Sequence, residues 1–151
     1  MEIERKFLIL KLPENLREYP SVEIEQAYLN EKPVLRIRRS GDRYIMTLKS
    51  GGMMAREEYE LELPEEAYLH LREKADGHVI TKTRHKIPYG EYVIELDVFS
   101  GCMKGLIMAE VEFPSVEEAE SFIAPDWFGK EVTNDPRYHN SFMAYAGTDR
   151  S

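Results

Sequence analysis

The N-terminal stretch Glu2-Ile3-Glu4-Arg5-Lys6-Phe7-Leu8 alternates charged and apolar side chains, and this alternation decides the fold class. Side chains of a β-strand point alternately to the two faces of its sheet, so residues two apart share a face. Glu2, Glu4 and Lys6 therefore lie on one face. The other face carries Ile3, Phe7 and Ile9. The pattern predicts a strand over residues 2–9 with one ionic and one apolar face.

The same alternation recurs in seven further segments bounded by Gly, Pro, Asn or Asp, which is typical of antiparallel strands joined by turns. These segments are residues 22–29, 33–39, 43–50, 56–63, 79–88, 91–98 and 106–113. Their ionic faces carry Arg36, Arg38, Arg56, Glu58, Glu60, Glu62, Lys82, Arg84, Lys86, Glu95, Asp97, Glu110 and Glu112. Their opposite faces are apolar, so the sequence predicts a mainly antiparallel sheet.

Three segments have helical rather than strand spacing. A segment opened by Pro64 has apolar residues at helical intervals and ends before Gly77. Ser115 and Glu118 have the spacing of a capping box ahead of a second helix. A third helix is expected near residues 138–146. The fold class is therefore α+β, and no linker divides the chain, so we expect a single domain over residues 1–151.

The ionic faces allow two arrangements. In an open antiparallel sheet they would face solvent while the apolar side packs on a core. Alternatively, the sheet closes into an eight-stranded β-barrel with the ionic face inward and helices flanking the apolar outside. We favour the closed barrel, because an open sheet of this size would carry two unpaired edges. A cavity lined by charges must hold water, ion pairs, metal or a polyanion.

Composition excludes several classes of function. The 151 residues carry a formal net charge of −8, which argues against nucleic-acid and anionic-membrane partners because the proteins that bind them are usually basic. Cys102 is the only cysteine, so no intrachain disulfide or thiolate zinc cluster can form. The apolar run at residues 7–10 is too short for a signal peptide or a membrane span. We expect a cytoplasmic protein, and a homodimer is among the oligomeric states that the sequence leaves open.

The spacing of the charges suits metal and phosphate together. Carboxylates two residues apart on one strand face offer paired oxygen donors of the kind that Mg²⁺ and Mn²⁺ prefer. Arginine and lysine at the same spacing suit phosphate. The four histidines have no paired metal-ligand spacing, and the chain has no Walker loop, nucleophile elbow or local Cys/His signature.

The opening stretch resembles the acidic-acidic-basic signature of the CYTH superfamily, the triphosphate tunnel metalloenzymes. Other stretches resemble that family in the same order, namely residues 35–38, 46–49, 56–60, 81–84, 95–97, 109–112 and 131–140. The resemblance implies an eight-stranded antiparallel barrel that forms a tunnel. In such a tunnel basic residues grip a triphosphate and acidic residues hold one or two divalent ions.

The same resemblance implies roles for individual residues. Triphosphate binding falls to Lys6, Arg36, Arg38, Lys49, Lys82, Arg84 and, less directly, Arg137. Binding of Mg²⁺ or Mn²⁺ falls first to Glu2, Glu4, Glu110 and Glu112, and then to Glu58, Glu60 and Asp97. Lys6, Glu2 and Glu4 are the candidates for positioning the attacking water. The alternative for each base is a structural salt bridge, and for some acids it is neutralisation of a neighbouring base.

These roles predict metal-dependent hydrolysis of a triphosphate, with inorganic tripolyphosphate as the first choice because no insertion can be assigned to a base or thiazole pocket. Pyrophosphate and orthophosphate would be the products. A class IV adenylate cyclase and a thiamine or nucleoside triphosphatase are the enzymatic alternatives. A polyphosphate-binding module without catalysis is the alternative from another class of function.

Overall fold

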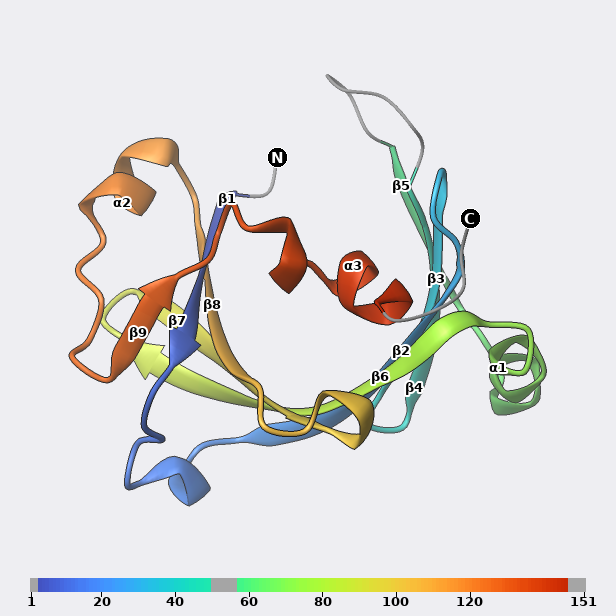
Figure 1. Cartoon of the computed structure of the whole chain (residues 1–151), viewed down its shortest axis with the longest axis horizontal. Helices are drawn as coiled ribbons and strands as arrows, with labels where there is room; N and C mark the ends of the chain where they lie inside the picture. Colours follow the sequence, from blue (N-terminus) through green and yellow to red (C-terminus); the bar gives the residue numbers. More distant parts are fainter. Residues whose placement is uncertain (1–2, 50–56, 147–151) are drawn as a thin grey trace. The chain divides into compact units, whose positions relative to one another are not determined.

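The computed structural model describes residues 3–49 and 57–146, and strands make up most of it (Figure 1). The strands are β1 (Ile3–Ile9), β2 (Ser21–Asn30), β3 (Val34–Ser40), β4 (Arg43–Lys49), β5 (Glu58–Glu62), β6 (Asp76–Tyr89), β7 (Tyr92–Ser100), β8 (Ile107–Phe113) and β9 (Phe128–Glu131). The α-helices are α1 (Glu65–Arg72), α2 (Val116–Ser121) and α3 (Asn140–Tyr145), and the 3₁₀ helices are η1 (Leu16–Glu18), η2 (Gly101–Met103) and η3 (Pro136–Tyr138).

The described strands hydrogen-bond in the order β5-β4-β3-β2-β6-β7-β8-β1-β9. Neighbours pair antiparallel in the ladders of β2 with β3, β3 with β4, β4 with β5, β7 with β8, and β1 with both β8 and β9. Each of the eight predicted strands is present, and the three helices lie where they were expected. The α+β, mainly antiparallel fold class is confirmed.

The prediction of a closed eight-stranded barrel is wrong. The described sheet has nine strands and remains open, with β5 and β9 as its edges. Closure was expected in order to remove long unpaired edges, but here the edges are protected in another way. β5 has five residues and β9 only four, so few backbone groups are left unpaired, and β5 also carries Glu58, Glu60 and Glu62. Short, charged edge strands are a common protection against edge-to-edge pairing.

The chain divides into two compact units. Unit 1 comprises Met1–Val22 and Lys82–Tyr138, and unit 2 comprises Glu23–Thr81 and His139–Ser151. Strands β2 and β6 each contribute residues to both units. The expectation of a single domain stays a prediction.

The core of unit 1 lies on the apolar face of β1, β7 and β8. Ile94, Leu96, Ala109 and Val111 are fully buried there. Helix α2 follows β8 and contributes the buried Ala119, and aromatic side chains after it pack against the same cluster. Strand β9 lies beside β1 (Figure 1). The apolar face that the sequence predicts for these strands is therefore confirmed in this unit.

The core of unit 2 is smaller. Ala27 of β2, Ile37 of β3 and Tyr68 of α1 form its buried centre, with Met46 and Leu63 packed around them. Helix α1 therefore covers the apolar face of β2 and β3. In contrast, Tyr59 and Leu61 on the apolar side of β5 are each 57% exposed.

In the described part of the chain, no helix combines the length and the apolar character that crossing a bilayer requires.

Candidate functional site

The ionic face of unit 1 brings together side chains of four strands. In the β1–β8 ladder Glu4 lies opposite Glu112 and Lys6 lies opposite Glu110. In the β7–β8 ladder Glu110 lies opposite Glu95. Directly opposite residues of antiparallel strands have Cβ atoms about 5 Å apart and interact. The structure thus gathers the candidates of β1 and β8 into two adjacent rows.

Glu4 and Glu110 are like charges that interact on this face. Burial, together with a hydrogen bond and charge repulsion from Glu4, raises the pKa of Glu110 to about 7, while Lys6 and Arg84 act in the opposite direction. Two carboxylates held together at neutral pH need either a shared proton or a cation between them.

This donor set fits a divalent metal ion. Glu4 and Glu110 supply hard oxygen ligands, and a cation between them would relieve the repulsion. Glu112, opposite Glu4, is exposed and within the same row. Within residues 3–49 and 57–146, no three acidic, histidine or cysteine side chains are already arranged around a metal position. Glu2, the remaining predicted ligand on β1, lies outside the described residues, as does Arg56.

Lys82 and Arg84 of β6 are neutralised by acids of β7. Lys82 Nζ lies 2.9 Å from Asp97 Oδ2, and both residues are only 4% exposed. Arg84 forms a fork with Asp97 at 2.8 and 2.9 Å and reaches Glu95 at 3.0 Å. Burial opposes the charge of Asp97, but hydrogen bonds from Arg84 and Lys82 hold its pKa below the ordinary value. Burial lowers the pKa of Lys82 despite this partner.

These contacts assign Asp97 to neutralising bases. With two cations already bound to it, Asp97 has little capacity left for a metal ion. Its predicted role as a ligand stays a prediction, and so do the roles of Lys82 and Arg84 in binding triphosphate.

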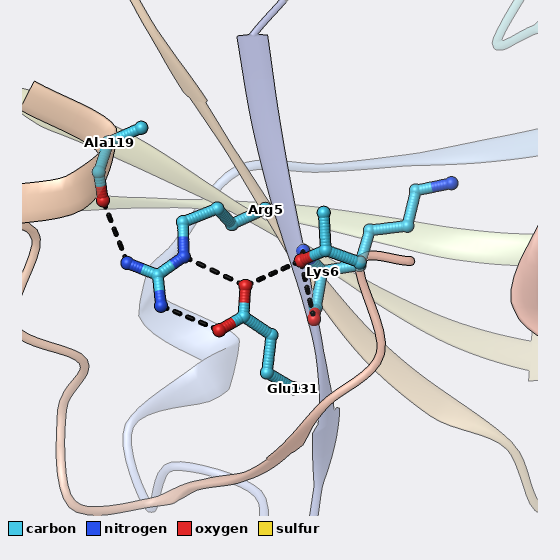
Figure 2. A network of polar contacts seen from close by, with 5 residues as sticks. Arg5, Lys6, Ala119 and Glu131 are labelled. Atoms are coloured by element: carbon cyan, nitrogen blue, oxygen red, sulfur yellow. Dashed lines mark hydrogen bonds and ion pairs between the residues drawn. The ribbon is translucent and has the colours of Figure 1, made fainter. Parts of the chain in front are cut away.

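A network on the opposite side of β1 supports the backbone of Lys6 (Figure 2). Arg5 donates hydrogen bonds of 2.8 and 2.6 Å to the two carboxylate oxygens of Glu131, and one of 2.7 Å to the carbonyl of Ala119. Thr133 donates to Glu131 at 2.6 Å and accepts from the backbone N–H of Lys6 at 3.0 Å. Figure 2 shows the Lys6 side chain extending away from this network. Strand alternation thus allows Arg5 to anchor β1 while Lys6 faces the acids.

Arg137 differs from the other predicted phosphate ligands. It lies in η3, is bound to Asp135 at 2.6 Å, and its side chain is 66% exposed. The hydrogen bonds from Arg137 lower the pKa of Asp135 to about 2. This local pair involves residues two apart in the sequence, so the contact itself gives no support to a role in binding.

The ionic face of unit 2 is built differently. In register across β2, β3 and β4, Tyr28 lies opposite Arg36 and Arg36 opposite Thr47. Gln26 lies opposite Arg38 in the β2–β3 ladder. Among the described residues, neither Arg36 nor Lys49 is ion-paired with a carboxylate.

Arg36 instead contacts a phenol. It donates a hydrogen bond to the hydroxyl of Tyr28, whose pKa nevertheless stays raised because the ring is buried. The Nε atom of Arg36 is buried and has no hydrogen-bond partner. A cationic face whose arginine donates only to a neutral group retains its capacity for an anion.

Glu58 and Glu60 project from the exposed edge strand β5. They lie opposite Lys49 and Thr47 in the β4–β5 ladder, and every residue of β5 is exposed. Their predicted role as metal ligands stays a prediction.

Sequence reasoning missed the uncharged members of the unit 2 face. Gln26, Tyr28 and Thr47 are 1%, 4% and 2% exposed. They lie opposite Arg36 or Arg38 on the same face of the sheet, so the two-residue period of the strands could have identified them. These side chains carry no charge, however, and the alternation of charges therefore did not mark them.

Comparisons with known proteins agree with this arrangement. The CYTH domain model matches residues 1–139. An inorganic triphosphatase of Nitrosomonas europaea is 43% identical over 148 residues, which cover 95% of this chain and 96% of that protein. An inorganic triphosphatase of Acetivibrio thermocellus is 37% identical, covering 93% and 90% of the two chains.

Among solved structures, that of the inorganic triphosphatase NE1496 superposes with a TM-score of 0.80 at 38% identity, covering 98% of this chain and 97% of that one. The sequence and the fold therefore point to one family: the chain belongs to the CYTH domain family.

Proposed function

We propose that this protein hydrolyses inorganic tripolyphosphate to pyrophosphate and orthophosphate with the help of Mg²⁺ or Mn²⁺. Two relatives of nearly the same length bear the name inorganic triphosphatase, which supports the reaction class. Two observations carry the proposal: among the described residues Arg36 and Lys49 of unit 2 have no carboxylate ion-pair partner, and in unit 1 Glu110 lies beside Glu4 with its pKa raised to about 7.

Anion binding falls first to Arg36, Arg38 and Lys49. Arg36 and Lys49 lack acidic partners among residues 3–49 and 57–146, so a phosphate group would not have to displace a carboxylate from them. Arginine can offer two parallel N–H groups to one phosphate, whereas lysine acts as a point charge. Lys6, Lys82 and Arg84 contribute positive charge on the unit 1 face.

Metal binding falls to Glu4 and Glu110, with Glu112 beside them and Glu2 as the further candidate on β1. A bound Mg²⁺ or Mn²⁺ would neutralise charge on phosphoryl oxygens and activate water. Deprotonation of Glu110 is required before it can act as a ligand, so metal binding should strengthen as the pH rises through about 7.

The expected reaction is in-line attack of water on a terminal phosphorus. Lys6 and Glu4 lie on the same face of β1 as neighbours two residues apart, and either can position that water. The Arg5 and Thr133 network behind the strand keeps the backbone between them in place. This accuracy matters because attack requires reacting atoms aligned at about 3–3.5 Å.

The experiment is phosphate release from tripolyphosphate, ATP and thiamine triphosphate, each with EDTA, Mg²⁺ or Mn²⁺. We expect tripolyphosphate to give the highest kcat/KM and EDTA to abolish release. Binding of tripolyphosphate without release under every metal condition would favour the non-catalytic polyphosphate-binding alternative. Preference for thiamine triphosphate or ATP would contradict the choice of inorganic substrate.

A further inference from the structure

The side-chain amide of Gln26 is a buried donor without an acceptor on the unit 2 face. Gln26, in the middle of β2, is 1% exposed, and its side-chain nitrogen Nε2 has no hydrogen-bond partner. Most buried polar side chains do have a partner, because an unmade hydrogen bond in the interior leaves the cost of desolvation uncompensated. An amide donor in this state therefore needs an explanation.

Its surroundings identify the missing acceptor. Gln26 lies directly opposite Arg38 and shares its face with Tyr28 and Arg36. Lysine and arginine supply only donors, and the hydroxyl of Tyr28 accepts a hydrogen bond from Arg36. A face rich in donors and positive charge attracts an anion with several acceptor oxygens.

We propose that the side-chain amide of Gln26 binds substrate directly, donating a hydrogen bond from Nε2 to a phosphoryl oxygen beside Arg38; this rests on the function proposed above. Gln26 thereby adds a neutral ligand to a set otherwise composed of cations. The neighbouring arginines are long and flexible, so a change in their rotamers on anion binding can bring the oxygen to the amide.

A neutral donor has a specific use among cations. Charge attracts any polyanion from a distance, whereas a hydrogen bond from a fixed amide requires an acceptor at one position. The amide should therefore contribute to affinity for tripolyphosphate more than for a smaller anion that cannot span the same positions, such as orthophosphate.

The variant Gln26→Met distinguishes a role in binding from a role in stability. It keeps the length of the side chain but removes the Nε2 donor, which has no acceptor in the structure. A structural role predicts lower stability, since a hydrogen bond would be lost. The proposal predicts the opposite combination, namely an unchanged or higher melting temperature with weaker binding. Ile24→Val is the matched control, because Ile24 is a buried residue of the same strand and face that has no donor.

The measurement is calorimetric titration of the full chain with sodium tripolyphosphate in EDTA, which prevents turnover, alongside thermal unfolding. We expect Gln26→Met to raise Kd at least tenfold, which corresponds to about 1.4 kcal/mol, while Ile24→Val leaves Kd unchanged. Gln26→Glu replaces the amide with a negatively charged carboxylate of similar size, so it should weaken binding further.

Wild-type affinity in both Gln26 variants would overturn this inference and leave the proposed function standing. A wild-type protein that does not bind tripolyphosphate would overturn both. A loss of affinity in Gln26→Met matched by a lower melting temperature would assign Gln26 to the structure instead, and so would also overturn the inference.

Discussion

The two units place charges on their sheets in opposite ways. In unit 1 the buried Lys82 and the part-buried Arg84 are bound by Asp97 and Glu95, and burial is tolerated because each charge has a partner. In unit 2 Arg36 donates a hydrogen bond to the hydroxyl of Tyr28, and Nε2 of Gln26 has no hydrogen-bond partner. The cluster of Lys82, Arg84, Glu95 and Asp97 is neutralised as it stands, whereas the second face would gain hydrogen bonds on binding an anion, as proposed above. The difference teaches that bases on the ionic faces of strands can be held by acids in one unit, whereas Arg36 in the other has no carboxylate ion-pair partner among the described residues.

The comparison is tested most strongly by Asp97→Asn. Removing this carboxylate leaves Lys82 and Arg84 buried without their shared counter-charge, and breaking a buried ion pair in this way costs about 3–5 kcal/mol. Urea denaturation should show that loss in the free energy of unfolding. Asp135→Asn removes an exposed partner of Arg137 and serves as control, with no expected change in the midpoint. A loss in Asp97→Asn no larger than in the control would contradict the structural role of the unit 1 pairs.

Neighbouring residues of β3 give the next test. Ile37 is fully buried, so Ile37→Ala should lower the free energy of unfolding by about 2–5 kcal/mol. Arg36 points to the other face, and Arg36→Ala should raise the Kd for tripolyphosphate about tenfold to a hundredfold, as loss of a charged hydrogen bond does. Titration calorimetry and denaturation on both variants check this. Normal binding by Arg36→Ala together with impaired binding by Ile37→Ala at unchanged stability would reverse the face assignment.

The raised pKa of Glu110 beside Glu4 predicts a pH dependence of stability of intermediate size. The pKa of Glu110 rises from 4.5 to about 7 on folding, so the folded protein holds the proton more tightly than the unfolded chain. The stabilisation is complete below pH 4.5 and is lost as the pH rises through 7, by up to about 3 kcal/mol in the metal-free protein.

Thermal unfolding in EDTA between pH 4.5 and 8.5, compared with Glu110→Gln, measures this effect. In Glu110→Gln the melting temperature should fall much less than in the wild type as the pH rises through about 7. Adding Mg²⁺ should raise the melting temperature of the wild type more at pH 8 than at pH 5.5. An identical pH profile in the variant would mean that the carboxylate pair does not form.

The smallest effect is expected at the edge strand. Glu60 is exposed on β5, while Glu110 is part of the buried pair. Glu60→Gln should change the activating concentration of Mn²⁺ by less than about threefold, and Glu110→Gln by about tenfold or more, because a carboxylate that binds the metal directly contributes more than one exposed on an edge strand. Metal titrations of phosphate release decide between them. Equal effects would place the acids of β5 among the metal ligands.

Much of the fold was predictable because alternation is a strong local signal. Eight strands, the two faces and the helices after β5 and β8 all follow from the period of apolar residues. Strand β9 was missed because its sequence Phe-Gly-Lys-Glu does not alternate. It forms because Gly129 permits a close approach to β1, where a Cβ would lie only 2.8 Å from the carbonyl oxygen of Leu8. Closure was wrongly predicted because the alternation assigns each residue to a face of the sheet but does not show whether the two edge strands pair with each other.

The candidate site was predictable only in part, for a similar reason. Parity placed Lys82, Arg84 and Arg36 on ionic faces, but which of them has an acid beside it depends on register between strands. The neutral Gln26 and Tyr28 carry no charge that would have drawn notice. The network of Arg5, Glu131 and Thr133 joins residues more than 120 positions apart, beyond the reach of any local pattern.

The central claim is that the protein hydrolyses tripolyphosphate, and phosphorus NMR of the products tests it most directly. The wild-type protein with Mg²⁺ or Mn²⁺ would be given tripolyphosphate and ATP in parallel reactions. We expect orthophosphate and pyrophosphate from tripolyphosphate at a higher kcat/KM than any reaction of ATP. Cyclic AMP and pyrophosphate from ATP, formed more efficiently than tripolyphosphate is hydrolysed, would contradict the account.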